Sequence, residues 1–142
     1  MNILKNLDAL LITNPTNIRY LTGFVGAAPD EREAYVLLTK SQTYLFTNAL
    51  YQEKAKKLTS LKRLNLLGTK GLTFIEISRE EPFAKKLAET FQGNRLGFEE
   101  NNLTVAEYQI LKKEIKKITL VPTQGRIEKL RMIKRQNEIG VI

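Results

Sequence analysis

The carboxylates of residues 30–33 are the densest group of side chains in this sequence that could do chemistry. Asp30, Glu31 and Glu33 follow turn-forming residues, and paired carboxylates can act as acid and base or hold a hard cation. A cation site would need further oxygen ligands, and acid–base chemistry would need a partner group. The chain has no histidine, the commonest general base and transition-metal ligand near neutral pH. We therefore expect these carboxylates to belong to a solvated loop.

No candidate nucleophile has the surroundings that nucleophilic catalysis requires. Cysteine is absent, which also excludes disulfides and thiolate metal sites. Ser41, Ser60 and Ser78 are not in a Gly-x-Ser-x-Gly turn, and no imidazole is available to activate a hydroxyl. The glycine pairs at 23 and 26 and at 68 and 71 lack the spacing of a phosphate-binding loop. The sequence thus predicts no catalytic residue and no metal ligand within its 142 residues.

The most specific motif is NIRYLTGF at residues 17–24. A helix would end here at Gly23, with the aromatic residues Tyr20 and Phe24 on either side. A packed helix end accounts for this pattern. A tyrosine hydroxyl can also bind a ligand, so a pocket-lining role stays open beside that interpretation.

A net charge of +8 makes nucleic acid a candidate partner. Most of the basic residues recur at helical spacing, however, which is typical of solvated helix faces; examples are Lys112, Lys113, Lys116 and Lys117. We find no helix-turn-helix pattern, zinc finger or aromatic-rich RNA-binding strand. A stand-alone nucleic-acid binder stays an alternative, but the loss of an acidic neighbouring domain would explain the charge equally well.

The hydrophobic pattern predicts strands that alternate with helices. Apolar or β-branched runs predict strands at 8–13, 34–39, 43–47, 61–67, 72–77, 96–98 and 119–122, with a hairpin turn at 40–42. Capping residues, proline and glycine predict helices at 14–23, after 48, at 82–93, after 104 and from 123 or 124 onward. Residues 104–107 form a capping box. This order predicts a single α/β domain whose mixed β-sheet is flanked by helices.

Some finer expectations follow from the same pattern. Ala88 should face the core from helix 82–93, and Ile133 should do so from the last helix. Glu99 precedes a helix, where its charge would complement the helix dipole. The start of the chain does not resemble a secretory signal, because Asp8 interrupts its apolar stretch, so we expect a cytoplasmic protein without a membrane span. The last helix has no stop signal before Gly140, so we expect the natural polypeptide to continue.

Four stretches, in this order, resemble the creatinase/aminopeptidase P/prolidase family. The first is NIRYLTGF at 17–24, which is similar to the family's Tyr-Leu-Thr-Gly-Phe signature. The second is YLFTNALY at 44–51, where Asn48 and Leu50 stand in place of the usual Asp and Arg. The third is LGFE at 96–99 with the capped helix after it, and the fourth is IEKLRMIKRQNEI at 127–139.

The resemblance implies a two-domain Xaa-Pro dipeptidase or aminopeptidase, a hydrolase of the metallopeptidase class. Residues 1–122 would form its creatinase N-terminal domain, ribonuclease H-like in fold, and 123–142 a linking helix that begins a pita-bread catalytic domain. That domain would hold two divalent metals, manganese or cobalt, through two Asp, one His and two Glu. These five ligands have no counterpart here, so no catalytic or metal-binding residue can be assigned, and the chain alone should be inactive.

The resemblance further implies that the domain supports homodimerisation and restricts access of proline-containing peptides to the active site. Its partners would then be its own catalytic domain and a second copy of the chain. We expect residues 24–32 to face the opening, with Tyr20, Phe24 and Arg32 lining the pocket. The alternative is a pseudo-peptidase that binds peptides or proteins without hydrolysis, which the departures at Asn48 and Leu50 favour.

Overall fold

The computed structural model describes residues 2–28, 30–58 and 71–140, with the side chains of 134–140 left out. Along the chain the elements are β1 (Ala9–Ile12), α1 (Pro15–Thr22), β2 (Ala34–Thr39), β3 (Thr43–Thr47), a 3-10 turn (Ala49–Tyr51), α2 (Gln52–Lys56), β4 (Leu72–Glu76), α4 (Phe83–Thr90), β5 (Arg95–Glu99), α5 (Val105–Glu114), β6 (Thr119–Thr123) and α6 (Arg126–Gly140). The strand predicted at 61–67 lies outside the described residues.

The six described strands form one mixed sheet in the order β4-β3-β2-β1-β5-β6. β2 runs antiparallel to both β1 and β3, and the β2–β3 pair is the predicted hairpin. The pairs β3–β4, β1–β5 and β5–β6 are parallel. The predicted α/β fold with a mixed sheet is therefore confirmed.

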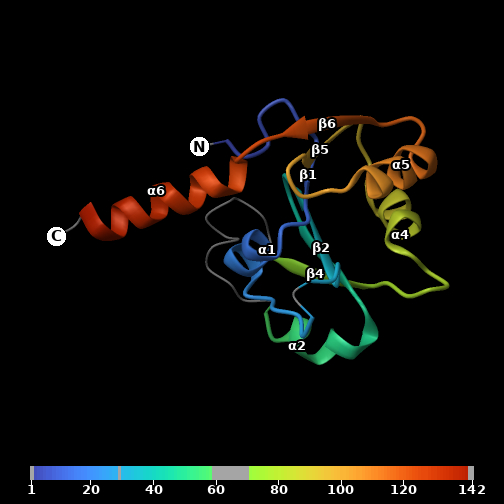
Figure 1. The fold of residues 1–142 in the computed structure, drawn as a ribbon, viewed down its shortest axis with the longest axis horizontal. Helices are drawn as coiled ribbons and strands as arrows, with labels where there is room; N and C mark the ends of the chain where they lie inside the picture. Colours follow the sequence, from blue (N-terminus) through green and yellow to red (C-terminus); the bar gives the residue numbers. More distant parts are fainter. Residues whose placement is uncertain (1, 29, 59–70, 141–142) are drawn as a thin grey trace.

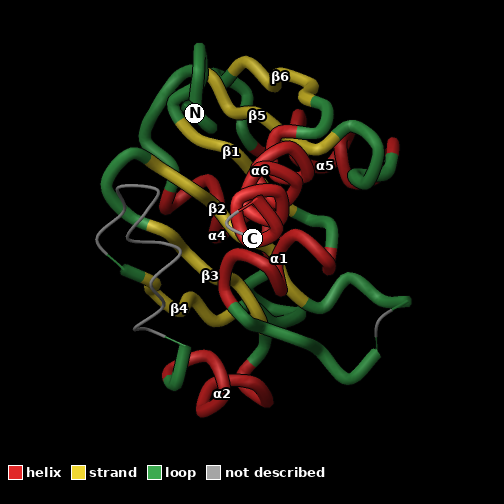
Figure 2. The backbone as a smooth tube through the Cα atoms, turned by 90° about the vertical axis from the view of Figure 1, so that its left-hand side faces the viewer, coloured by secondary structure: helices red, strands yellow, loops and turns green. Residues whose placement is uncertain are grey.

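Helices cover both faces of this sheet (Figure 1). Side chains alternate along each strand, so Leu10 and Ile12 of β1 enter one core cluster and Ala9 and Leu11 enter the other. The first cluster includes residues of α1, α2 and the start of α6, and the second includes residues of α4 and α5. Figure 2 shows α1 and α6 in front of the strands.

Local signals set both ends of α1 and the start of α5 as predicted. The Asn14 side chain accepts hydrogen bonds from the backbone N–H groups of Thr16 and Asn17, and Gly23 ends α1 in the left-handed conformation, with φ 81°. At α5, the Thr104 hydroxyl accepts from the Glu107 N–H while the Glu107 carboxylate accepts from the Thr104 N–H. The predicted capping box is therefore confirmed.

Two helices differ from their predicted bounds and faces. α4 ends at Thr90 rather than at Gly93, because Phe91 turns to an extended conformation and buries its ring. Ala88 is exposed, since the buried stripe of α4 is limited to Phe83, Ala84 and Leu87.

α6 begins at Arg126, because Thr123 still belongs to β6. It leaves the body of the domain after its first turns (Figure 1). Ile127 is therefore buried, whereas Ile133 is 41% exposed, and its predicted inward orientation is wrong for this chain.

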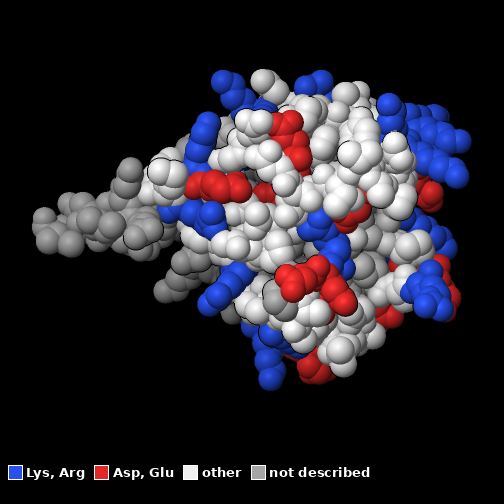
Figure 3. Space-filling view, viewed as in Figure 1, with Lys and Arg blue, Asp and Glu red and all other residues white. Residues whose placement is uncertain are grey.

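The basic side chains lie mainly at the rim of the face shown in Figure 3, most densely where α5 lies in Figure 1. Lys112, Lys113, Lys116 and Lys117 are all exposed, as their helical spacing predicts.

Candidate functional site

The segment from Phe24 to Glu33, here called the 24–33 loop, connects α1 to β2 beside the carboxyl end of β1. The Thr22 hydroxyl donates to the Ile18 carbonyl and accepts from the Phe24 N–H at 3.1 Å, so the loop starts from a fixed point. Phe24 itself is only 3% exposed. The loop therefore departs from α1 with its first side chain already part of the core.

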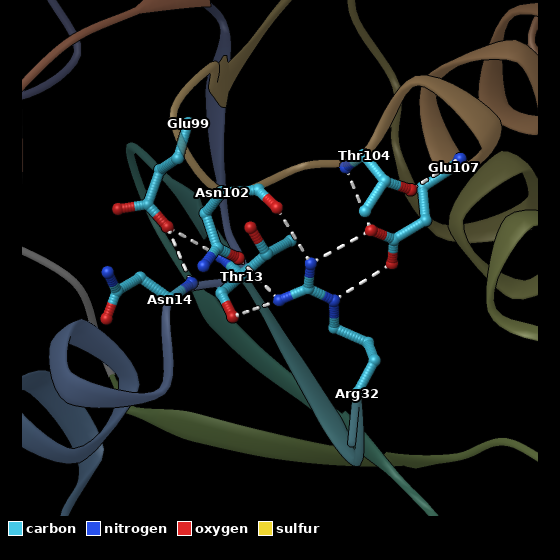
Figure 4. A network of polar contacts seen from close by, with 7 residues as sticks. All are labelled: Thr13, Asn14, Arg32, Glu99, Asn102, Thr104 and Glu107. Carbon is cyan, nitrogen blue, oxygen red and sulfur yellow. Dashed lines mark hydrogen bonds and ion pairs between the residues drawn. The ribbon is translucent and has the colours of Figure 1, made fainter. Parts of the chain in front are cut away.

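Arg32 holds the other end of the loop (Figure 4). Its Nε and Nη2 donate to the two carboxylate oxygens of Glu107, each at 2.9 Å. Nη1 donates to the Thr13 carbonyl and to Asn102 Oδ1, and Nη2 also donates to the Asn102 carbonyl. These bonds use all five N–H donors that a guanidinium has. Arg32 thus joins the loop to β1 and to the start of α5.

The ion pair is partly shielded from water, which shows in its pKa values. Burial alone would lower the pKa of Arg32, but the hydrogen bonds and charge of Glu107 outweigh it and raise that pKa. Burial alone would raise the pKa of Glu107, but the hydrogen bonds and charge of Arg32, together with hydrogen bonds from Thr104, outweigh it and lower that pKa. Nearby, burial and the charge of Glu107 raise the pKa of Tyr35 to about 12. Both members of the pair therefore stay charged at neutral pH.

Glu99 has a role that its place in the sequence did not predict. Its Oε1 accepts from the backbone N–H groups of Thr13 and Asn14, at 2.7 and 2.8 Å, and its Oε2 accepts from Asn17 Nδ2. It therefore stabilises the start of α1, not the following helix. Burial raises the pKa of Glu99, an effect that these three hydrogen bonds only partly oppose. No sequence signal indicates this contact, because it depends on β5 lying beside β1.

Glu33 is not a solvated carboxylate, contrary to the expectation for this acidic group. Its Oε1 accepts from the Ala28 N–H at 2.6 Å, and its Oε2 accepts from the Tyr51 hydroxyl at 2.5 Å. The same hydroxyl accepts from the Ala27 N–H at 2.9 Å. We call this set of contacts the Glu33–Tyr51 latch. The contacts of the Tyr51 hydroxyl have no local sequence signal, because they join residues 24 and 18 positions apart.

A small cavity of about 180 Å³ lies between α1 and the 24–33 loop. Phe24 and Arg32 both line it, together with Thr16 and Arg19 of α1. Tyr20, the third predicted pocket residue, is half-buried against the core and is not among the lining residues. The structure thus brings two of the three residues together, and Arg32 does so with its donors already engaged.

The described part of the chain offers no cluster of three His, Cys, Asp or Glu side chains that could hold a metal ion. The residues present therefore do not fit a two-metal centre, and we derive no catalytic step from them. None of the helices in the described ranges has both the length and the apolar character that a membrane span requires.

Known proteins resemble this chain in sequence and in fold. Residues 4–133 match the family model described as the Creatinase/Prolidase N-terminal domain. The uncharacterized peptidase YqhT of Bacillus subtilis is 32% identical over 136 residues, which cover 96% of this chain and 35% of that protein. The chain thus spans about a third of the length of this curated relative.

Solved structures agree with the family match. An Xaa-Pro aminopeptidase from Streptococcus pyogenes is 36% identical, with a TM-score of 0.69 over 89% of this chain and 85% of that one. An Xaa-Pro dipeptidase from Bacillus anthracis is 29% identical, with a TM-score of 0.65 over 89% of this chain but 31% of that one.

Proposed function

The chain belongs to the creatinase/prolidase N-terminal domain family, and from this premise we propose that it is the non-catalytic domain of an Xaa-Pro metallopeptidase. The observation that carries the proposal is the match to relatives named as peptidases, of which YqhT extends far beyond the matched part. Catalysis would then belong to a following domain that holds the two divalent metals.

α6, which begins at Arg126, supports a linking helix after the proposed N-terminal domain of residues 1–122, although Thr123 itself still belongs to β6. It projects from the body of the domain (Figure 1). Met132 is 61% exposed and Ile133 is 41% exposed. Adjacent exposed apolar side chains on a projecting helix favour contact with another domain. Homodimerisation and a cytoplasmic location stay predictions from the resemblance and the sequence.

The 24–33 loop would restrict access of proline-containing peptides to the metal centre. Phe24 and Arg32 hold its two ends in place, which supports a fixed position for these described ends beside the opening. Because all five donors of Arg32 are used, we assign it the task of holding the loop, not of binding the peptide. Among the described residues of the loop, Val25, 44% exposed, and the exposed Ala27, Asp30 and Glu31 are available to face a substrate.

The first test is the coding sequence downstream of residue 142. The proposal requires a second domain with two Asp, one His and two Glu as metal ligands. The purified 142-residue chain should not hydrolyse Xaa-Pro peptides even with added manganese. Turnover that scales with the amount of pure chain would refute its non-catalytic role.

The second test concerns access. In the full-length protein, Phe24→Ala and Arg32→Ala should change the preference for peptide length or for the first residue. Thermal melts of the same variants show whether the domain is still folded at the assay temperature. Unchanged kinetics in folded variants would remove the access role.

Leu50 favours a second candidate, a pseudo-peptidase that binds a protein or peptide without hydrolysis. It is 83% exposed at a position where the family usually has arginine. A single exposed apolar side chain is common on protein surfaces, so this candidate rests on the departure from the family pattern at positions 48 and 50. The downstream ligand set separates the two functions, because a pseudo-peptidase would lack some or all of the five ligands.

A further inference from the structure

Residues 24–28 have backbone groups that neither the sheet nor a helix satisfies, yet two of them are held by the Glu33–Tyr51 latch. The Ala28 N–H donates to the Glu33 carboxylate, and the Ala27 N–H donates to the Tyr51 hydroxyl. The hydroxyl in turn donates to Glu33. Exposed connecting segments usually adopt several conformations unless their backbone groups find partners. The latch supplies such partners from the end of the loop and from the turn before α2.

Aromatic and basic side chains reinforce the same contact. The rings of Phe24 and Tyr51 meet edge to face, with centroids 5.2 Å apart. Lys54 of α2 donates to the Val25 carbonyl at 2.5 Å, and its Nζ lies 5.7 Å from the centre of the Phe24 ring. The segment around α2 therefore holds the loop through both its side chains and its backbone.

Gly26 shows how closely the loop and Glu33 approach each other. A Cβ atom at this position would lie 2.5 Å from Glu33 Oε1 and 2.9 Å from Glu33 Cδ. The Glu33 carboxylate would have to shift to make room, which would disturb its hydrogen bonds with the Ala28 N–H and the Tyr51 hydroxyl. A side chain at position 26 should therefore weaken the latch.

We infer that Tyr51 and Glu33 are positioning residues, which hold residues 24–28 in one conformation and so set which proline-containing peptides reach the active site. The statement about peptides rests on the proposed function, whereas the statement about the loop does not. The hydrogen bond to Glu33 also raises the pKa of Tyr51, so the hydroxyl keeps its proton at neutral pH.

The first experiment uses the 142-residue chain and measures hydrogen exchange at the amides of Ala27 and Ala28. Tyr51→Phe should accelerate exchange at both amides by about tenfold, because it removes a hydrogen bond to a charged acceptor and an acceptor of the Ala27 N–H. Gly26→Ala should do the same without altering either latch residue. Tyr108→Phe, a matched loss of a hydroxyl outside the latch, should leave both amides unchanged.

The second experiment measures kinetics of the full-length peptidase on Xaa-Pro substrates of increasing length. Tyr51→Phe and Glu33→Ala should change KM for longer peptides several-fold more than for the shortest, with kcat nearly constant, because the metal centre is untouched. Glu33→Gln keeps an oxygen acceptor for the Ala28 N–H and should restore most of the selectivity. A general loss of stability would instead lower activity equally on all peptides.

The outcomes separate the inference from the function on which it rests. Unchanged exchange in both Tyr51→Phe and Gly26→Ala would overturn the latch whatever the enzyme does. Faster exchange with unaltered selectivity, in a protein whose selectivity does respond to Phe24→Ala, would overturn the positioning role and leave the access role standing. If neither Tyr51→Phe nor Phe24→Ala alters selectivity, both the access role and the inference fall.

Discussion

Replacing Arg32 with alanine should lower the free energy of unfolding by about 3 kcal/mol. Losing one partner of a fully buried ion pair costs about 3–5 kcal/mol, and losing one partner of an exposed pair costs under about 1 kcal/mol. The side chains of Arg32 and Glu107 are 20% and 24% exposed, so solvent screening places this pair at the lower end of the buried range. The carbonyls of Thr13 and Asn102 lose a donor as well.

This loss can be measured by thermal and urea denaturation of the 142-residue chain. For a domain of this size, about 3 kcal/mol corresponds to a fall in Tm of roughly 6–12 °C. The Tm of Arg32→Lys should lie between that of the wild type and that of Arg32→Ala. Lysine keeps the charge but not the planar guanidinium that binds both Glu107 oxygens. Lys85→Gln removes an exposed pair with Glu81, 46% and 41% exposed, and should leave Tm unchanged as a control.

A double-mutant cycle with Glu107→Gln isolates the pair. Glutamine is also accepted at this position of a capping box, so the helix start survives while the ion pair is lost. We expect a coupling energy of about 2 kcal/mol between positions 32 and 107. A coupling energy near zero, or an Arg32→Ala variant that melts with the wild type, would refute the role of Arg32 in holding the loop.

Substitutions at three further positions test other contacts of the domain. Glu99→Ala leaves two backbone N–H groups without their acceptor and should cost about 2–4 kcal/mol, whereas Glu99→Gln keeps an oxygen for both. Because burial raises the pKa of Glu99 in the folded chain, the wild type should lose stability relative to Glu99→Gln as pH rises from the unfolded value of 4.5, in urea titrations at several pH values. Gly97→Ala places a Cβ 2.5 Å from Leu7 Cδ1 and should cost about 1–3 kcal/mol by denaturation. Thr104→Ala removes the N-cap of α5 and should cost about 1 kcal/mol by the same measurement.

The pKa values of Glu107 and Glu99 shift in opposite directions on folding, so the two residues change the stability of the domain with pH in opposite ways. The pKa of Glu107 is lowered in the folded chain, so its contribution is complete above the unfolded value of 4.5 and is lost as pH falls through the folded value. Glu99 behaves in the opposite way. An acid-induced loss of stability that disappears in Glu107→Gln, with the reverse slope removed in Glu99→Gln, would assign each effect to its residue.

Much of the fold could be predicted because its signals are local. Asn14, Gly23 and the capping box at Thr104 pair with backbone groups within four residues of themselves. As expected, Asn14 and Thr104 begin their helices and Gly23 ends α1. Apolar and β-branched runs placed the strands, since such residues are enriched in strands. Where prediction was wrong, as for Ile133, the error lay in what covers a helix, which its own periodicity does not contain.

The candidate site was predicted only in part. The motif at 17–24 and the loop after it were identified by resemblance, and two of the three named residues do line one cavity. The roles of Arg32 and Glu99 were not predictable, because their partners are far away in the sequence. Glu107 is 75 residues from Arg32, and Thr13 is 86 residues from Glu99. A charged residue in a sequence shows what it can bind, but not what lies beside it.

By itself, then, the amino-acid sequence determined the class of fold, both ends of α1, the start of α5 and the absence of histidine and cysteine chemistry, since these follow from composition and from interactions within one turn. Tertiary structure alone decided that the acidic and basic groups near the loop face one another. Strand order brings the ends of β1, β2 and β5 together, and partial burial there makes each charge require its partner.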